Sequence, residues 1–305
     1  MPTDRFRVGS VTKTFVAALT LSLAAEGKLG LSDPVARRLP GIFPYGSQIT
    51  IRQLLNHTSG LYDFTHDPRV QSRVHAQVAA IHAGRSTRGT GLSPGAVVGI
   101  AASHPLDFSP GSDWAYSNTG YVVLGLIDEK VTGQSLAAAL RARIFEPLRL
   151  QQSAFAPDGE IPGPHATGYL IEPGGGRMWR ADTTPPGGWA ASAIVSTTAD
   201  LARFFSALLG GRLLPPHLMR EMLATVSTHR NYNGGATTDG LGIFRYPEAC
   251  GVAWGHSGGE PGFGVYVLSD RHARHLTVLA INGQNQATTQ NLSAAAERLY
   301  CRSLG

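Results

Sequence analysis

Residues 6–15 read Phe6-Arg7-Val8-Gly9-Ser10-Val11-Thr12-Lys13-Thr14-Phe15. From Val11 onward, apolar residues recur at helical spacing as far as Leu23, and Gly27 offers a stop, which predicts a helix. Residues three apart share one face of a helix. The hydroxyl of Ser10 would therefore lie beside the amine of Lys13, as in a serine nucleophile paired with its base. The alternative is an N-cap serine next to a solvated lysine.

The scarcity of lysine favours the first interpretation. Of the 26 lysines and arginines in the chain, only Lys13, Lys28 and Lys130 are lysines. Ser10 is the only serine that stands three residues before any of them. An arginine keeps its proton, whereas burial lowers the pKa of a lysine so that it can act as a base. Lys13 is therefore predicted to have a role that arginine could not fill.

Composition limits the class of protein. The chain has 305 residues, 42% of them hydrophobic and 15% charged, which predicts a globular protein of one or two domains. No apolar run approaches the roughly 20 residues of a membrane span. The net charge is +5, but the arginines are scattered, so we expect no nucleic-acid partner and a small-molecule or peptide substrate. The spacings of Cys and His that are typical of metal sites are lacking, so we predict no metal. We also predict no cofactor and a monomeric protein.

Hydrophobic periodicity predicts an α+β fold. Helices are expected at 50–57 with a Thr50 cap, weakly at 68–83, and then at 119–131, 135–145, 198–209 with a Thr198 cap, and 215–225. Residues 157–188, rich in Gly and Pro, are expected to form a long ordered loop. Near the end, an antiparallel three-strand meander is predicted at 250–257, 263–269 and 275–282, followed by a helix at 287–302.

A second candidate element is Tyr116-Ser117-Asn118, just before a predicted helix. In an extended segment, residues two apart project to the same side. The phenol of Tyr116 and the amide of Asn118 could then face one cleft, the first to move a proton and the second to hold an amide carbonyl. The alternative is an N-cap asparagine beside a packed tyrosine.

The third candidate element is Trp254-Gly255-His256-Ser257-Gly258-Gly259, which contains the pattern G-x-S-x-G around Ser257. A nucleophile elbow needs a strand, a sharp turn and then a helix. Here the next residues, 260–264, lead into another strand, and a trypsin-like all-β fold conflicts with the helical middle of the chain. The glycines are better explained as letting the strand edge approach a ligand closely.

Ser10-x-x-Lys13, Tyr116-x-Asn118 and His256-x-Gly258, in this order, resemble the three motifs of the penicillin-recognising serine hydrolases. This superfamily includes class C β-lactamases, D-Ala-D-Ala carboxypeptidases, D-aminopeptidases and related esterases. The resemblance extends over nearly the whole chain, through segments 7–13, 51–62, 116–121, 129–133, 196–201 and 255–258. The chain is most similar to the soluble, secreted D-Ala-D-Ala carboxypeptidases, which carry His in the third motif.

The resemblance implies a role for each matching residue. Ser10 would be the acylated nucleophile, Lys13 would help to take its proton, and Tyr116 would relay that proton. Asn118 would hold the substrate amide, and the backbone N–H groups of Ser10 and Gly259 would form the oxyanion hole. The remaining expected site residues are His256 and Ser257, which would help to hold the leaving-group carboxylate, and Trp189, which would form part of the cleft wall.

The resemblance also implies a β-lactamase/transpeptidase-like fold, an antiparallel sheet flanked by helices. Residues 1–45 and 186–305 would form an α/β domain. Residues 46–185 would form an inserted all-α domain, with the site between the two. No counterpart of the class A deacylating glutamate can be identified, so slow deacylation after β-lactam attack is expected.

Two departures concern substrate choice. The carboxypeptidases carry a hydroxyl residue directly after the His-x-Gly motif, where this chain has Gly259. Their substrate-carboxylate arginine aligns with Phe244, and the neighbouring candidate, Arg245, would face the other way in a strand. Both departures leave room for an esterase, an amidase or a peptide-cyclising acyl transferase.

Another departure concerns the chain start. Family members carry a longer segment, including two sheet strands, before the Ser/Lys helix, so those strands are expected to be missing here and to leave a hydrophobic sheet edge. Cys250 and Cys301 stand where such carboxypeptidases have a disulfide, which suits export. We therefore expect a secreted or extracytoplasmic protein if the natural start lies upstream, and a cytoplasmic one if the chain is complete.

The preferred prediction is a serine hydrolase or acyltransferase of the D-alanyl-D-alanine carboxypeptidase type, or a related D-amino-acid peptidase, that binds penicillin. An esterase or a β-lactamase of the same fold is the enzymatic alternative. The non-enzymatic alternative is a β-lactam or peptidoglycan-fragment binding protein that does not turn over.

Overall fold

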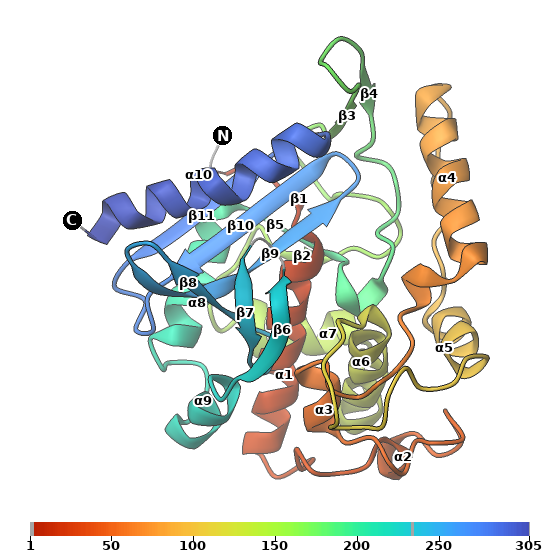
Figure 1. Cartoon of the computed structure of the whole chain (residues 1–305), viewed down its shortest axis with the longest axis vertical. Helices are drawn as coiled ribbons and strands as arrows, with labels where there is room; N and C mark the ends of the chain where they lie inside the picture. Colours follow the sequence, from red (N-terminus) through yellow and green to blue (C-terminus); the bar gives the residue numbers. More distant parts are fainter. Residues whose placement is uncertain (1–2, 233–234, 305) are drawn as a thin grey trace.

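The computed structural model describes residues 3–232 and 235–304 and has the predicted α+β fold. A large antiparallel sheet with helices on both faces makes up one side of the molecule, and a group of helices makes up the other (Figure 1). Residues from both ends of the chain meet at the sheet, because α1 (Thr12–Ala25) packs beneath strands that come from the last quarter of the sequence.

The main sheet has six strands in the order β11-β10-β9-β8-β7-β6, and all neighbours are antiparallel. The predicted meander corresponds to β9 (Gly251–Glu260), β10 (Phe263–Ser269) and β11 (Leu276–Ile281). Three further strands extend it, β6 (Val226–Tyr232), β7 (Ala236–Asp239) and β8 (Phe244–Glu248). Sequence patterns predicted none of them, and only the family resemblance placed Phe244 and Arg245 in a strand. Strand β11 ends the sheet and has no further strand beside it among the described residues.

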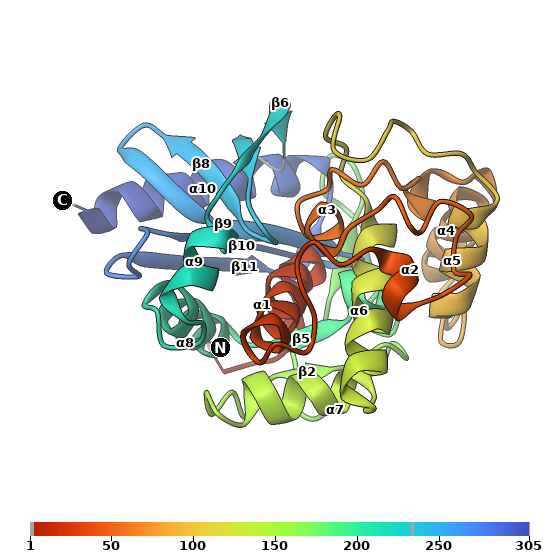
Figure 2. The ribbon, with the colours of Figure 1, turned by 90° about the horizontal axis from the view of Figure 1, so that it is seen from below.

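Strand β10 shows how the sheet separates two layers of core. Phe263, Val265 and Val267 belong to the large core that contains α1 and α8 (Thr198–Leu209), whereas Tyr266 and Leu268 pack in a second cluster with residues of α10 (Gln286–Leu304). Successive side chains of a strand point to opposite faces, so the fully buried β10 serves both layers. Figure 2 shows α10 on one face of the sheet and α1 and α8 on the other.

The remaining helices follow the predicted pattern with two differences. They are α2 (Val35–Arg38), α3 (Ile51–Leu55), α4 (Pro68–His82), α5 (Pro94–Ala102), α6 (Asn118–Thr132), α7 (Leu136–Leu140) and α9 (Pro216–Met222). Thr50 caps α3 in a reciprocal capping box with Gln53. The cap of α8 is Thr197, not Thr198, because the Thr197 side chain accepts the N–H of Asp200. Two helices were not predicted. Helix α2 has only four residues, too few to show a periodicity, and the sequence of α5 lacks a polar face.

Short elements connect these layers. Two small sheets have the orders β1-β5-β2 and β12-β3-β4. Their strands are β1 (Phe6–Arg7), β2 (Ala154–Phe155), β3 (Tyr169–Ile171), β4 (Met178–Arg180), β5 (Ile194–Ser196) and β12 (Gly283–Gln284). Single turns of 3₁₀-helix are η1 (Gly9–Val11), η2 (Phe64–His66) and η4 (Trp189–Ala191), and η3 (Arg141–Phe145) is a π-helical turn.

The segment 46–185, expected to be all helical, thus also contains β2, β3 and β4. Strands β3 and β4 lie within the segment 157–188 that was expected to be a loop, and the pair is short and partly exposed. Strands of two or three residues lack the alternation that reveals longer ones. The division into two domains stays a prediction.

Two further observations concern the whole chain. Cys250 and Cys301 form a disulfide that joins the start of β9 to α10 across 51 residues. Among the described residues, no helix is both long enough and apolar enough to span a membrane.

Candidate active site

Strand β9 is longer than its neighbour β8, and this difference creates the site. The pairing of β8 with β9 ends at Phe244 and Gly255, whereas β9 continues to Glu260 and there pairs only with β10. The edge that β8 leaves uncovered is occupied by η1, which packs against β9. Ser10, in the middle of η1, therefore lies beside residues 256–260.

Glycines allow the two backbones to touch. A Cβ added to Gly9, whose φ is +50°, would lie 2.5 Å from the backbone N of Gly259. A Cβ added to Gly258 would lie 2.0 Å from the carbonyl O of Val8 and 3.0 Å from the N of Ser10. No side chain fits at either position. The N–H groups of Ser10 and Gly259, predicted as the oxyanion hole, thus belong to two backbone segments in direct contact.

Lys13 is buried and makes three hydrogen bonds through its Nζ. The acceptors are Ser10 Oγ at 3.0 Å, Asn118 Oδ1 at 2.8 Å and the carbonyl O of Ala191 at 2.9 Å. Ser10 and Lys13 thus lie side by side, as their spacing predicts. Lys13 is not solvated, so the alternative interpretation does not apply. Residues from η1, α6 and η4 thus meet at an amine carried by α1.

Burial lowers the pKa of Lys13 to about 7, and the charges of Asp63, Glu260 and Asp239 oppose that shift. A substantial fraction of the amine is therefore neutral near pH 7. A neutral amine within hydrogen-bonding distance of Ser10 Oγ can accept its proton, which is what general base catalysis requires.

Tyr116 and Asn118 both lie at Lys13, so their side chains project to one side, which is what their spacing predicts. The Lys13 Nζ lies 4.8 Å from the centroid of the Tyr116 ring. The alternative of an N-cap asparagine does not apply, because Ser117 caps α6 by accepting the N–H of Gly120. The Asn118 side chain is thereby left to bridge Lys13 and Asp63, to whose Oδ2 its Nδ2 donates at 2.9 Å.

His57 supports Tyr116 and was not singled out from the sequence, although it lies in a segment that carried the family resemblance. Its buried ring has its centroid 4.3 Å from that of Tyr116, and its Nδ1 accepts the N–H of Ser117 at 3.2 Å. Its carbonyl O accepts the N–H of Ala115. Burial and the charge of Lys13 hold the pKa of His57 well below its usual value, so the ring is neutral. The backbone of His57 has a left-handed φ of +59°, which sets the direction in which the side chain leaves the backbone.

His256 faces the same cluster and is also uncharged. Burial, with the Lys13 charge adding to it, lowers the pKa of His256 to about 3. Its Nδ1 lies 2.6 Å from the carbonyl O of Ser257, an acceptor, so Nδ1 carries the proton. Its ring centroid is 5.0 Å from that of Phe244, whose own ring is 6.4 Å from Tyr116.

A pocket of about 430 Å³ opens beside Ser10, between β9, β10 and α10. Its polar lining residues carry no formal charge and include Ser257, Gln284, Thr289, Gln290 and Ser293. Neutral hydrogen-bonding groups of this kind orient a substrate without requiring it to be charged.

Two predicted site residues lie elsewhere. Phe244 faces His256 and Tyr116, so Arg245, the next residue of β8, projects from the opposite face of the sheet. Trp189 packs on α6, where a Cβ added to Gly125 would lie 2.7 Å from its Cζ3, and edge-to-face on Phe155. Neither residue lines the pocket at Ser10.

Three buried carboxyl groups near Lys13 were not anticipated, because no spacing rule connects residues so far apart in sequence. Asp63 precedes η2, Asp239 ends β7, and Glu260 ends β9. Burial raises the pKa of Glu260, and it raises that of Asp239 well above its usual value. Among the described residues, no group of three or more His, Cys, Asp or Glu could hold a metal ion.

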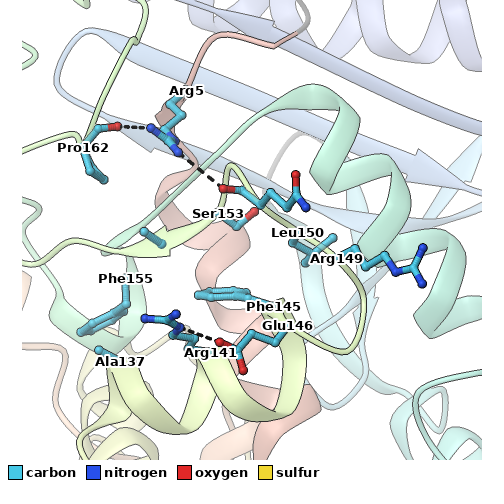
Figure 3. Close-up of a pocket in the computed structure, with 12 residues that line it drawn as sticks. Arg5, Ala137, Arg141, Phe145, Glu146, Arg149, Leu150, Ser153, Phe155 and Pro162 are labelled. Atoms are coloured by element: carbon cyan, nitrogen blue, oxygen red, sulfur yellow. Dashed lines mark hydrogen bonds and ion pairs between the residues drawn. The ribbon is translucent and has the colours of Figure 1, made fainter.

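A second pocket, of about 610 Å³, lies between η3 and β2 (Figure 3). Apolar side chains such as Phe145 share its lining with arginines. Arg141 pairs with Glu146, with Nε 2.8 Å from Oε1, and Arg5 donates to the carbonyl of Pro162. Ser10, Lys13 and Tyr116 do not line this pocket, so it is not the candidate active site.

Comparison with known proteins agrees with this geometry. The family model described as Beta-lactamase matches residues 2–301. The esterase EstB of Burkholderia gladioli is 31% identical over 296 residues, covering 86% of this chain and 72% of the esterase. Penicillin-binding protein 4* of Bacillus subtilis (strain 168) is 29% identical, with 96% of this chain covered but only 64% of that protein. The crystal structure of a D-stereospecific amidohydrolase from Streptomyces sp. superposes with a TM-score of 0.83 at 35% identity, covering 95% of this chain and 86% of that one.

Proposed function

Because this chain belongs to the β-lactamase family of serine hydrolases, we propose that it hydrolyses amides or esters of D-amino acids through an acyl-enzyme at Ser10. The observation that carries the proposal is the contact of the buried Lys13 amine with Ser10 Oγ at 3.0 Å. A D-amino-acid donor is supported by the similarity to the D-stereospecific amidohydrolase.

The residues divide the reaction between them. In acylation the Ser10 Oγ–H proton passes to Lys13 Nζ while Oγ bonds to the substrate carbonyl carbon. The N–H groups of Ser10 and Gly259 stabilise the resulting oxyanion. The leaving amine or alcohol departs with a proton relayed through Tyr116. In deacylation water loses a proton along the same route, attacks the acyl carbon and releases Ser10.

The charges around the site favour an uncharged leaving group. His256 is neutral. Phe244 stands at the position that aligns with the carboxylate-binding arginine of the carboxypeptidases, and Arg245 is on the opposite face of β8. A free C-terminal carboxylate held against His256 and Phe244 would be desolvated with no charge on either side chain to pair with it, which is costly. The narrower prediction of a D-Ala-D-Ala carboxypeptidase stays open, and these observations support an amidase or an esterase over it.

A matched substrate pair tests this choice. D-Ala-D-Ala and its C-terminal amide differ only in the terminal charge, and the L,L amide serves as the stereochemical control. We expect the D,D amide to have the highest kcat/KM and a Ser10→Ala variant to hydrolyse none of them. Preference for the free carboxylate would restore the carboxypeptidase. Full activity of Ser10→Ala would rule out the acyl-enzyme.

Incubation with benzylpenicillin, followed by intact-mass analysis and peptide mapping, tests the alternatives. A single adduct on Ser10, absent from Ser10→Ala, would identify the nucleophile. An adduct without turnover of any ester or amide would favour the binding protein, and rapid hydrolysis of the penicillin would favour the β-lactamase. Turnover of p-nitrophenyl acetate alone would favour the esterase.

A further inference from the structure

Four side chains form a continuous hydrogen-bonded row that ends at the nucleophile. Asp63 Oδ2 accepts from Asn118 Nδ2 at 2.9 Å, Asn118 Oδ1 accepts from Lys13 Nζ at 2.8 Å, and Lys13 Nζ lies 3.0 Å from Ser10 Oγ. Asp63 and Lys13 are both buried. The second oxygen of Asp63 accepts the N–H of Thr65 at the start of η2, which holds the carboxylate in place.

This row of hydrogen bonds determines where the lone pair of a neutral Lys13 amine points. A neutral lysine amine has two N–H donors and one lone pair. The carbonyl O of Ala191 is only an acceptor, so it takes one donor. Asn118 Oδ1 takes the other. The remaining position, the lone pair, then points at Ser10 Oγ and can receive its proton.

This outcome depends on which end of the Asn118 amide faces Lys13. If the amide were flipped, Nδ2 would donate to the lysine lone pair, and Lys13 would offer Ser10 an N–H instead of a base. A carboxylate accepts hydrogen bonds and cannot donate them. Asp63 therefore requires Nδ2 on its own side and Oδ1 on the side of Lys13.

We propose that Asp63 is a positioning residue for the nucleophile: it fixes the Asn118 amide so that the neutral Lys13 amine acts as a base toward Ser10. This inference rests on the proposed acyl-enzyme at Ser10 and names a residue whose side chain bonds to Asn118 and Thr65 and not to Ser10 itself.

The negative charge of Asp63 also affects the pKa of Lys13, and this effect can be measured. Several titratable groups face Lys13, namely Asp63, Asp239, Glu260, His57, His256, Tyr116 and Tyr121. The two histidines are neutral, and burial raises the pKa of both Asp239 and Glu260, which limits their negative charge. Of the charged groups that raise the pKa of Lys13, Asp63 has the largest effect. Removing its charge therefore lowers that pKa.

The experiment compares wild-type protein with Asp63→Asn. An asparagine that keeps the cap on Thr65 with its oxygen turns its Nδ2 toward Asn118. It then donates where Asp63 accepts, so it no longer holds the Asn118 amide with Oδ1 toward Lys13. The rate of Ser10 acylation by a p-nitrophenyl ester is measured against pH by quenched flow and intact mass. We expect the plateau rate to fall about 10- to 100-fold, part of the 10²- to 10⁴-fold that a general base supplies. We expect the acid limb to move down by about one pH unit.

Asp128→Asn is the matched control. Asp128 is a buried carboxyl group in α6 that accepts from Thr20, and burial raises its pKa well above its usual value. Its replacement should leave both the plateau and the acid limb unchanged. Asp63→Ser is a second variant, for use if Asp63→Asn folds poorly. Serine keeps a cap but is too short to reach Asn118, so the acid limb of this variant should move down by the same amount.

A folded Asp63→Asn protein whose acid limb coincides with that of the wild type would overturn the inference, even with a lower rate, because a purely structural role changes the rate alone. A wild-type protein that is not acylated at Ser10 would instead overturn the proposed function and this inference with it.

Discussion

Gly9 packs against Gly259 so closely that a Cβ on Gly9 would lie 2.5 Å from the Gly259 nitrogen. The two residues are 250 positions apart, yet their contact sets the distance between the turn that carries Ser10 and the strand edge that completes the site. The geometry of the proposed oxyanion hole depends on the absence of side chains at Gly9 and Gly258.

Gly9→Ala is therefore expected to push η1 away from β9. Loss of one oxyanion donor costs on the order of 100-fold or more in kcat, and a loss of that size is predicted here. Steady-state kinetics with a D-amino-acid ester would measure it.

Gly27→Ala provides the matched control for backbone strain. Gly27 also has a positive φ, +68°, but nothing lies within 4 Å of an added Cβ. It should lose about 1–2 kcal/mol of stability and keep its kcat. Equal kcat values for the two variants would contradict the role of the Gly9 contact.

The pH dependence should report Lys13. Its pKa is lowered to about 7 by burial, and only the neutral amine can accept the Ser10 proton. We therefore expect kcat/KM to rise with pH through about 7 and then level off. A profile of log kcat/KM against pH measures the midpoint.

Lys13→Arg tests whether that midpoint belongs to Lys13. An arginine keeps its proton over this range, so the variant should be inactive at every pH. The solvent-exposed Lys130→Arg should behave like the wild type. Retention of the same midpoint by an active Lys13→Arg protein would show that another group controls the profile.

His57 is expected to hold Tyr116 in position. His57→Ala leaves the buried N–H of Ser117 without its acceptor, a loss of about 1–3 kcal/mol, and should also lower kcat. Asparagine tolerates a positive φ and offers an oxygen in place of Nδ1, so His57→Asn should recover part of both losses. Urea unfolding and kcat measure the two effects.

The exposed His75→Ala, in α4, controls for removal of a histidine. If His57→Asn were no better than His57→Ala, the hydrogen bond to Ser117 would not explain the role of the residue.

Arg245→Gln should leave the choice of substrate unchanged, because the Arg245 side chain lies on the face of β8 opposite Phe244. We expect kcat/KM for D-Ala-D-Ala and for its amide to stay within about twofold of the wild-type values, as for other substitutions away from a site. A selective loss with the free carboxylate would place Arg245 in the substrate pocket.

Reduction of the disulfide should lower stability without changing the chemistry. A closed loop of 51 residues contributes about 4 kcal/mol in the chain-entropy model. Cys250→Ser/Cys301→Ser should therefore unfold at a lower urea concentration and keep its kcat at 25 °C. Equal urea midpoints for the variant and the oxidised wild type would show that the bond does not stabilise the fold.

Local sequence determined the features that depend on a few neighbouring residues. The spacing of Ser10 and Lys13 placed them on one helix turn, Tyr116 and Asn118 were placed on one side of the chain before α6, and alternating apolar residues located β9–β11. In each case the residues concerned lie a few positions apart along the chain, where backbone geometry alone decides which side chains are neighbours.

The tertiary structure decided what surrounds those residues. Local patterns did not anticipate that Asp63 bridges to Lys13 through Asn118 or that β8 stops short of β9. These relationships join segments tens to hundreds of residues apart, and they follow from how whole elements pack. The chemistry of Lys13 depends on them, because the burial that lowers its pKa and the acceptors that orient its lone pair come from other parts of the chain.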